Sequence, residues 1–186
     1  MLNVQELKKK KKEAIQQVVQ TLIDNDIDFV IIGGYCRYII GEEEDFKDID
    51  IVTDTDINLL YKLFPNAGRN LYGGLSLFGV ADIWDIKTNV IPVNNFRELY
   101  DAYFITYDAI MYHPRTNTWY TDHYYNNVVD INPETESRQT QPLLNALKLE
   151  KLMFEKRLAL TQRAKEYYDK FKKQLIFFGC EGYVDN

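Results

Sequence analysis

One short segment constrains the fold of this chain most strongly: an apolar run that ends in two glycines. Residues 29–32 read Phe-Val-Ile-Ile, and Gly33 and Gly34 follow directly. A β-branched apolar run closed by glycines is typical of a buried strand that ends in a tight turn. Residues 35–40 then fit a short helix that ends at Gly41. The segment therefore predicts a strand, a glycine turn and a helix in succession.

The next predicted strand carries two acidic residues. In a strand over residues 48–53, alternation places Asp48 and Asp50 on one face, with their α-carbons about 6–7 Å apart. Such a pair can hold one or two Mg²⁺ ions, which prefer oxygen ligands and retain phosphate oxygens in their coordination shell. The preceding glycine turn suits the same ligand, because glycine N–H groups can approach a triphosphate closely. Together the two segments predict a site for a metal and a triphosphate.

A third carboxylate is expected on a later strand. Two metal ions about 3.5–4 Å apart can clamp the attacking and leaving oxygens of a nucleotidyl transfer, and such chemistry usually needs one more acidic ligand. The predicted strand 80–87 offers Asp82 and Asp85, which point to opposite faces. Burying an unpaired carboxylate in an apolar core is costly, so one of the two faces either solvent or the metal site. Spacing alone leaves both candidates open.

Each of these features also has a simpler interpretation. A double glycine is most often a plain turn, and Asp48 and Asp50 could form the exposed face of an edge strand. The prediction of a site depends on the combination of strand, glycine turn, acidic pair and further acidic strand, in that order. The lysine run at residues 8–12 also has two interpretations, since it fits either a solvated helix face or an electrostatic handle that binds RNA.

The remaining pattern predicts helices packed on a mixed sheet. We predict helices over residues 4–25, 56–64, 94–100 and 124–129, strands over residues 73–78 and 103–112, and a long helical region, broken once, over residues 143–178. Residues 132–142 are polar, contain two prolines and fit a connector. The fold class is therefore α+β: a mixed twisted sheet with flanking helices, followed by a helical C-terminal region.

Composition excludes several classes of protein. Of the 186 residues, 46% are hydrophobic and 27% are charged, as in ordinary globular domains. Cys36 and Cys180 alone cannot make a disulfide framework or a four-ligand zinc site. Neither an apolar stretch of about 20 residues nor a signal peptide is visible, so we expect no membrane partner and a cytoplasmic location.

The segments with candidate chemistry resemble a known superfamily. Residues 31–41 read I-I-G-G-Y-C-R-Y-I-I-G and residues 47–53 read K-D-I-D-I-V-T. They resemble the G-G-x-V-R-D-x-L-L-G and D-I-D-[IL]-x-T segments of polymerase-β-like nucleotidyltransferases, in the branch of class II CCA-adding enzymes and bacterial poly(A) polymerases. Residues 82–87 resemble the third-carboxylate strand of that branch, and residues 105–110 resemble its F-T-I-N-A-L segment. The resemblance covers about residues 27–131.

This resemblance implies a nucleotidyltransferase head, an NTP substrate and two Mg²⁺ ions. The matching positions imply that the catalytic residues and metal ligands are Asp48, Asp50 and Asp82, with Asp85 second to Asp82. They imply nucleotide-binding roles for a further set: Gly33, Gly34, Arg37, Lys87, Thr106 and Asp108. Residues 1–131 would form the catalytic head with its N-terminal helix, and residues 132–186 a helical neck-like region.

The chain departs from the family pattern at several positions. Tyr38 stands where the family has Asp, residues 102–104 replace an R-R-D triplet, and Asp108 replaces an Asn. The E-D-x-x-R motif with which CCA-adding enzymes select CTP and ATP is not visible over residues 143–168. The match therefore supports a catalytic head more strongly than it supports CCA addition.

Charge is distributed unevenly along the chain. The net charge is −6, yet residues 148–173 contain nine Lys and Arg against four Asp and Glu. This basic stretch fits either a solvated helix face or a surface for an RNA backbone. An acidic total is thus compatible with a local surface for RNA.

The leading hypothesis is an Mg²⁺-dependent nucleotidyltransferase that transfers NMP from an NTP to an acceptor hydroxyl and releases pyrophosphate. The expected acceptor is an RNA 3′ end, such as that of tRNA. One alternative is a non-catalytic nucleotide- or RNA-binding module of the same fold, and another is a toxin-type nucleotidyltransferase that modifies tRNA, protein or a small molecule. The sequence leaves the base preference and the oligomeric state open.

Overall fold

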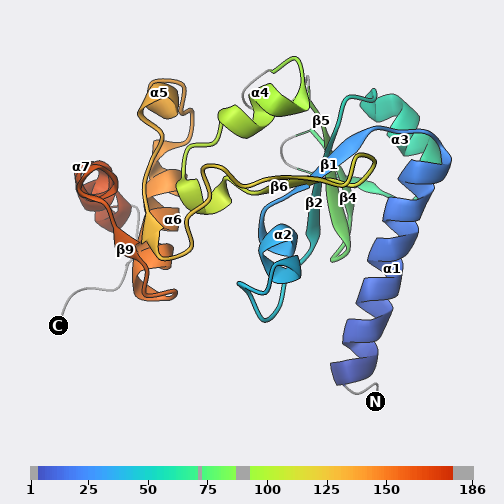
Figure 1. The fold of residues 1–186 in the computed structure, drawn as a ribbon, viewed down its shortest axis with the longest axis horizontal. Helices are drawn as coiled ribbons and strands as arrows, with labels where there is room; N and C mark the ends of the chain where they lie inside the picture. The colour runs from blue at the N-terminus through green and yellow to red at the C-terminus, as the bar shows by residue number, and fades with distance from the viewer. Residues whose placement is uncertain (1–3, 71–72, 87–92, 178–186) are drawn as a thin grey trace. The chain divides into compact units, whose positions relative to one another are not determined.

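The computed structural model describes residues 4–70, 73–86 and 93–177. The chain divides into two compact units, which we describe separately: unit 1 comprises Met1–Asp101 with Ile110–Tyr120, and unit 2 comprises Ala102–Ala109 with Thr121–Asn186. A mixed sheet with flanking helices and a helical C-terminal region confirm the predicted fold class (Figure 1). The predicted division into a head over residues 1–131 and a neck-like region over residues 132–186 stays a prediction.

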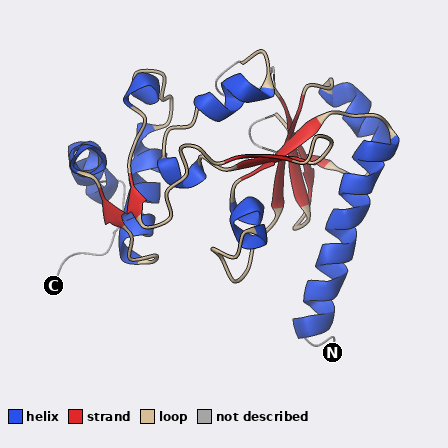
Figure 2. Cartoon of the chain, in the orientation of Figure 1, coloured by secondary structure: helices blue, strands red, loops and turns tan. Residues whose placement is uncertain are grey.

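Unit 1 is built on a seven-stranded mixed sheet (Figure 2). Its strands, in their order across the sheet, are β3 (Gly68–Arg69), β4 (Leu75–Leu77), β5 (Ala81–Asp85), β2 (Ile49–Thr53), β1 (Phe29–Ile32), β6 (Met111–His113) and β7 (Thr118–Tyr120). Its helices are α1 (Val4–Asp24), α2 (Gly34–Ile39), α3 (Ile57–Leu63) and α4 (Phe96–Asp101). Strands β2 and β5 run parallel, whereas the other described neighbours in this sheet are antiparallel.

One face of this sheet carries a continuous row of core side chains. Ile31, Ile51 and Ile83 are register neighbours on β1, β2 and β5, so their buried side chains share a face. Helix α1 lies beside this face and buries Ile15 and Leu22 (Figure 1). Because side chains alternate along a strand, residues 32, 50 and 82 point to the opposite face. That face buries Val30 and Val52 as well, and it carries Asp50 and Asp82 beside these apolar side chains.

The local patterns predicted most elements of unit 1. The strands at residues 29–32 and 48–53 are confirmed as β1 and β2, and residues 81–85 of the predicted strand 80–87 form β5. The remaining predictions in this unit correspond to α1, α2, α3, α4 and β4.

The predicted strand over residues 103–112 is wrong over most of its length. Only Met111–His113 joins the sheet as β6, while residues 102–109 belong to unit 2 and contain the single-turn 3₁₀ helix η1 (Thr106–Asp108). Phe104 and Ile105 are buried in the core of unit 2, and the backbone of Ile105 bridges to Ile131. These residues have the apolar and aromatic composition of a strand because they fill a second core.

Unit 2 is mainly helical. The short α5 (Pro133–Glu136) precedes α6 (Pro142–Phe154) and α7 (Gln162–Phe177), which confirm a helical region that is broken once. The predicted helix at residues 124–129 is wrong, because β8 (Val128–Val129) pairs in parallel with β9 (Ala159–Leu160) in the break between the helices. None of the helices in the described ranges is long and apolar enough to cross a membrane.

Candidate active site

Two aspartates of unit 1, Asp50 and Asp82, are neighbours across the sheet and form a carboxylate row. Asp50 of β2 is the register partner of Asp82 of β5. On its other side Asp50 pairs with Ile32, the last residue of β1, and Asp82 pairs in turn with Ser76 of β4. Neighbouring strands lie about 4.8 Å apart, so the carboxylates of Asp50 and Asp82 emerge side by side from one face.

Asp82 carries a polar atom that has no partner among the residues that the structure describes. Its Oδ1 is buried and accepts no hydrogen bond from the described residues. Leaving a buried acceptor unsatisfied costs about 1–3 kcal/mol, and more when the group is charged. A cation held between Asp50 and Asp82 would supply the missing partner, so the donor set at this point of the sheet fits a metal ion.

Gly33 lets the backbone turn directly against Asp50. Its φ is +73°, and a Cβ added to it would lie 3.0 Å from Oδ2 of Asp50. Both facts favour glycine, which adopts left-handed conformations readily and leaves room for the carboxylate. Gly33 joins the end of β1 to the start of α2, where it is the N-cap residue. The predicted glycine turn therefore borders the carboxylate row.

A polar cavity of about 450 Å³ opens beside this turn. Its lining residues come from α2, from the loop that follows and from β2: Gly34, Arg37, Glu43, Asp45, Phe46, Lys47, Asp48 and Asp50. Nζ of Lys47 lies 3.5 Å from Oδ2 of Asp48, but the Lys47 side chain is 90% exposed. Such an exposed ion pair is weak, so Asp48 can exchange this partner for a metal or a ligand.

Arg37 is buried and is held by a carboxylate. Its Nε donates to Oε1 of Glu43 at 2.8 Å, and the two side chains are only 10% and 12% exposed. A Cβ added to Gly34 would lie 3.6 Å from an Nη atom of Arg37, so the guanidinium lies against the glycine turn. The planar guanidinium has five N–H donors, which is enough to bind Glu43 and an anion in the same cavity.

Two residues beside the cavity are absent from the predicted set. Glu43 stands in an acidic run over residues 42–45, where the sequence does not distinguish the one carboxylate that meets Arg37. Phe46 is buried although it lies in a loop. A lone aromatic residue within a charged segment is the signal that could have indicated an anchored loop.

The strand register separates Asp82 from Asp85. Asp85 is the partner of Thr53 and points to the face opposite Asp50, where it is buried. Asp82 shares the face of Asp50. Strand register thus shows that Asp82, and not Asp85, lies beside Asp50. The role of Asp82 as a metal ligand stays a prediction.

The described residues do not form a metal site with three or more protein ligands. Among the described residues, no three His, Cys, Asp or Glu side chains are grouped so that they could hold a metal ion. The assignment of Asp48, Asp50 and Asp82 as metal ligands stays a prediction. Mg²⁺ is often held by one or two carboxylates together with waters and substrate phosphates, and the neighbours Asp50 and Asp82 suit that mode.

Three predicted nucleotide-binding residues lie outside this arrangement. Lys87 is outside the described residues. Thr106 is buried in unit 2, where its hydroxyl accepts a hydrogen bond from the N–H of Asp130 at 2.9 Å. Asp108, also in unit 2, places Oδ2 2.5 Å from Nζ of Lys148. The nucleotide-binding roles of these three residues stay predictions.

Cys36 lies in α2 next to the turn but is unsuited to nucleophilic chemistry. It is fully buried, and its Sγ donates to the carbonyl of Ile31 at 3.2 Å. Burial raises the pKa of the Cys36 thiol to about 12. Because the thiolate is the nucleophile, a thiol that stays protonated at neutral pH acts as a small apolar filler.

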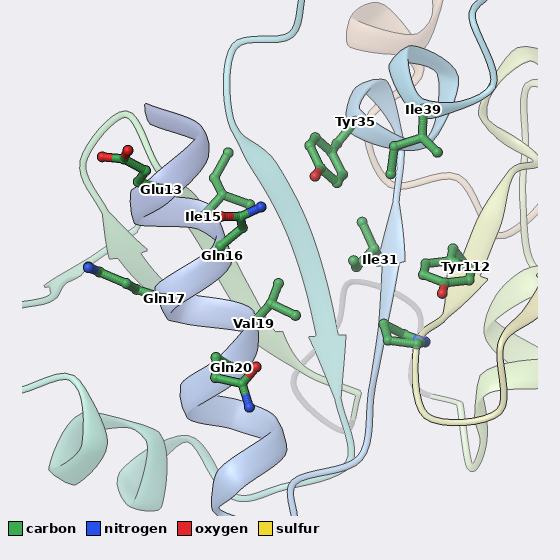
Figure 3. Close-up of a pocket in the computed structure, with 11 residues that line it drawn as sticks. Glu13, Ile15, Gln16, Gln17, Val19, Gln20, Ile31, Tyr35, Ile39 and Tyr112 are labelled. Atoms are coloured by element: carbon green, nitrogen blue, oxygen red, sulfur yellow. The ribbon is translucent and has the colours of Figure 1, made fainter. Parts of the chain in front are cut away.

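A larger cavity lies away from the carboxylate row. It has a volume of about 680 Å³ and lies between α1, α2, β1 and β6 (Figure 3). Its wall includes Ile31, which points to the face opposite Asp50 and Asp82, and the amide side chains of Gln16 and Gln20. This cavity therefore does not belong to the candidate active site.

Among comparisons with known proteins, only the comparison with solved structures finds similar chains. No protein-family model matches the sequence, and a search of curated proteins finds no match. A tRNA-processing enzyme in an apo form has a TM-score of 0.59 and 14% identity, covering 91% of this chain and 48% of that chain. A CCA-adding enzyme with CTP has a TM-score of 0.58 and 12% identity, covering 89% and 42%. A tRNA nucleotidyltransferase with a primer tRNA and an incoming ATP analogue has a TM-score of 0.55 and 16% identity, covering 86% and 50%.

The structural similarity extends over nearly all of this chain, while the sequence similarity is low. The chain spans about half the length of the structures that it matches. Unit 1 contains the strand, glycine turn and acidic strands on which the family resemblance rests. This chain therefore has the nucleotidyltransferase fold of the tRNA-processing and CCA-adding enzymes.

Proposed function

We propose that this chain is an Mg²⁺-dependent nucleotidyltransferase, which transfers NMP from an NTP to an acceptor hydroxyl and releases pyrophosphate. One observation carries the proposal: Asp50 and Asp82 are register partners, and Oδ1 of Asp82 is buried with no donor in the described part of the chain. The close approach of Gly33 to Asp50 supports it, because a triphosphate must lie near both a metal and backbone N–H groups. Solved structures of the same fold contain CTP or an ATP analogue.

The residues of unit 1 divide the proposed chemistry between them. Asp48, Asp50 and Asp82 would hold Mg²⁺, which when bound neutralises phosphate charge and polarises the attacking hydroxyl. The backbone N–H groups of Gly33 and Gly34 orient the triphosphate. The Asp82 carboxylate would accept the proton of the acceptor hydroxyl while the hydroxyl oxygen bonds to the α-phosphorus. The bond between that phosphorus and the pyrophosphate breaks in the same displacement.

We propose an RNA 3′ end as the acceptor. Two of the matched structures are described as a tRNA-processing enzyme and as a tRNA nucleotidyltransferase with a primer tRNA. In unit 2, α7 buries Tyr167 and Tyr168 and exposes basic side chains: Arg163, Lys165, Lys170 and Lys173. Glu166 and Asp169 are exposed on the same helix, so its outer surface is mixed in charge with an excess of basic side chains, which suits contact with a phosphate backbone.

Transfer from labelled NTPs tests the proposal. The protein is incubated with Mg²⁺, total RNA and each of the four NTPs in turn, and both labelled RNA and pyrophosphate are measured. We expect transfer that EDTA abolishes and that Asp50→Ala and Asp82→Ala abolish. Asp54→Ala, which removes an exposed carboxylate just beyond β2, is the matched control and should leave transfer unchanged. Absence of transfer, pyrophosphate and Mg²⁺-dependent NTP binding in the wild type would refute the proposal.

One observation favours a second candidate, a nucleotide-binding module without catalysis. Tyr38 stands at a family Asp position, and its ring packs against Phe46 with the ring centres 4.7 Å apart. The described residues also lack a group of three metal-ligand side chains. This candidate predicts Mg²⁺-dependent NTP binding in equilibrium dialysis with no turnover on any acceptor.

A further inference from the structure

We propose that the lysine run of α1 positions the acidic segment that enters β2, with Lys11 as the central residue. The inference rests on the proposed function, because it concerns the carboxylates assigned there to Mg²⁺. It gives residues 8–12 a role inside unit 1, beyond a solvated helix face or a handle for RNA.

Three lysines of α1 reach α2 or the loop between α2 and β2. Nζ of Lys11 donates to the backbone carbonyl of Phe46 at 2.7 Å and lies 4.9 Å from the centre of the Phe46 ring. Nζ of Lys8 lies 3.1 Å from Oδ2 of Asp45. Nζ of Lys12 lies 5.2 Å from the ring centre of Tyr38 in α2. We call these contacts the lysine clamp.

Helix geometry explains which lysines take part. An α-helix has about 3.6 residues per turn, so positions i, i+3 and i+4 lie on one face. Lys8, Lys11 and Lys12 occupy such a face, whereas Lys9 and Lys10 lie on the remaining surface. Within residues 8–12, all of which are described, Lys11 is the one partly buried residue. The run therefore contains the clamp residues and, in Lys10, a lysine on another face that serves as a control.

Phe46 is the residue that the clamp holds. It is 8% exposed although it belongs to a loop. Its ring meets the ring of Tyr35 edge-on at 4.9 Å and packs against Tyr38 at 4.7 Å between centres. Helix α2 thus holds the ring, while Lys11 of α1 holds the carbonyl of the same residue. The loop is fixed from two sides at one point.

This point is close to the candidate active site along the chain. Phe46 precedes Asp48 by two residues, so at most about 7 Å of extended backbone separates them. Asp45, Phe46, Asp48 and Asp50 line the same polar cavity. A shift of the Phe46 carbonyl would therefore move Asp48, and a misplacement of about 1 Å can lower a rate by about a hundredfold.

The contacts of the clamp are unequal. The side chains of Lys8 and Asp45 are 53% and 61% exposed, and exposed pairs of this kind contribute little. Lys11 satisfies a main-chain carbonyl and adds a cation–π contact with the same residue. The decisive test therefore changes Lys11.

The test compares Lys11→Met, Lys11→Arg and Lys10→Met in the full chain. Lys11→Met keeps the apolar stem and removes the donor, whereas Lys11→Arg keeps both donor and charge. For each variant we would measure amide hydrogen exchange over residues 45–50, Mn²⁺ affinity by electron paramagnetic resonance, and kcat and KM for nucleotidyl transfer. Lys10→Met removes the same charge from another face of α1 and is the matched control.

We expect faster exchange over residues 45–50 in Lys11→Met only. In the same variant, kcat and Mn²⁺ affinity should fall by about tenfold to a hundredfold, with the KM for RNA unchanged. Lys11→Arg, which keeps both donor and charge, should restore both values. If Lys11→Met does not fold, Lys11→Leu, which also lacks a donor, replaces it.

Two results would overturn the clamp. One is equal kcat and Mn²⁺ affinity in Lys11→Met and Lys10→Met. The other is a raised KM for RNA in both variants with kcat unchanged, which would instead identify a handle for RNA. A wild type with neither turnover nor Mn²⁺ binding refutes the proposed function. Hydrogen exchange alone then decides the clamp, and equal exchange in the two variants overturns it.

Discussion

Asp50 and Asp82 are brought side by side by the parallel pairing of β2 and β5, and one oxygen of Asp82 is buried there with no hydrogen-bond donor among the described residues. Each aspartate is the second residue of its strand, so parallel register alone aligns them. The buried acceptor lowers the stability of the metal-free protein and is available to a cation. Stability and metal binding should therefore be linked at this point of the sheet.

Asp82→Asn tests that link without an activity assay. Mg²⁺ or Mn²⁺ at about 100 times its Kd should stabilise the wild type by about 2.7 kcal/mol, because a ligand that binds only the folded state shifts the unfolding equilibrium. In Asp82→Asn this gain should be lost, while stability without metal stays equal or rises, since the variant removes a buried charge that lacks a donor. Urea unfolding with and without metal gives both values. A full metal-dependent gain in the variant would contradict the assignment.

Gly33→Ala should harm both stability and the site. Its φ of +73° is unfavourable for alanine, and the new Cβ would lie 3.0 Å from Oδ2 of Asp50. We expect a loss of about 1–3 kcal/mol in the free energy of unfolding together with weaker NTP binding. Gly41→Ala is the matched control, because Gly41 has φ +83° and open space around its Cβ position. It should show the backbone strain alone and keep NTP binding.

The ion pair between Arg37 and Glu43 should be important for stability. Both side chains are nearly buried, and removing one partner of a buried pair leaves an uncompensated charge, which costs about 3–5 kcal/mol. Glu43→Ala should therefore destabilise the protein by several times more than Glu44→Ala, which removes an exposed neighbour. Thermal unfolding measures the difference. Similar melting temperatures for the two variants would show that Arg37 finds another partner.

The Cys36 thiol should be unreactive in the folded protein. Burial raises the pKa of this thiol to about 12, so the thiolate is scarce at pH 8. In a Cys180→Ser background, a disulfide reagent should label Cys36 only after denaturant is added. The raised pKa also predicts that stability falls as pH rises above about 8.5, because the unfolded thiol ionises first. Rapid labelling without denaturant would contradict the burial of Cys36.

Local patterns predicted the parts of the site that depend on neighbouring residues in the chain. The apolar run before Gly33 and the alternation around Asp50 each act through their own backbone geometry, so β1, the turn and β2 could be recognised from the sequence. The segment 103–109 could not be recognised, because its apolar and aromatic composition fits a strand but its side chains fill the core of unit 2. A pattern shows that a residue is buried, but it does not show in which core.

The sequence by itself determined a glycine turn after one strand and an acidic pair on the next, since those features follow from steric freedom at glycine and the two-residue period of a strand. Tertiary structure decided which later aspartate stands beside Asp50, because strand register is a long-range property. It also decided that Lys11 contacts Phe46, across 35 positions of the chain. The physical reason is the same for both: contacts between distant segments are selected by the packing of the whole core, which no local spacing encodes.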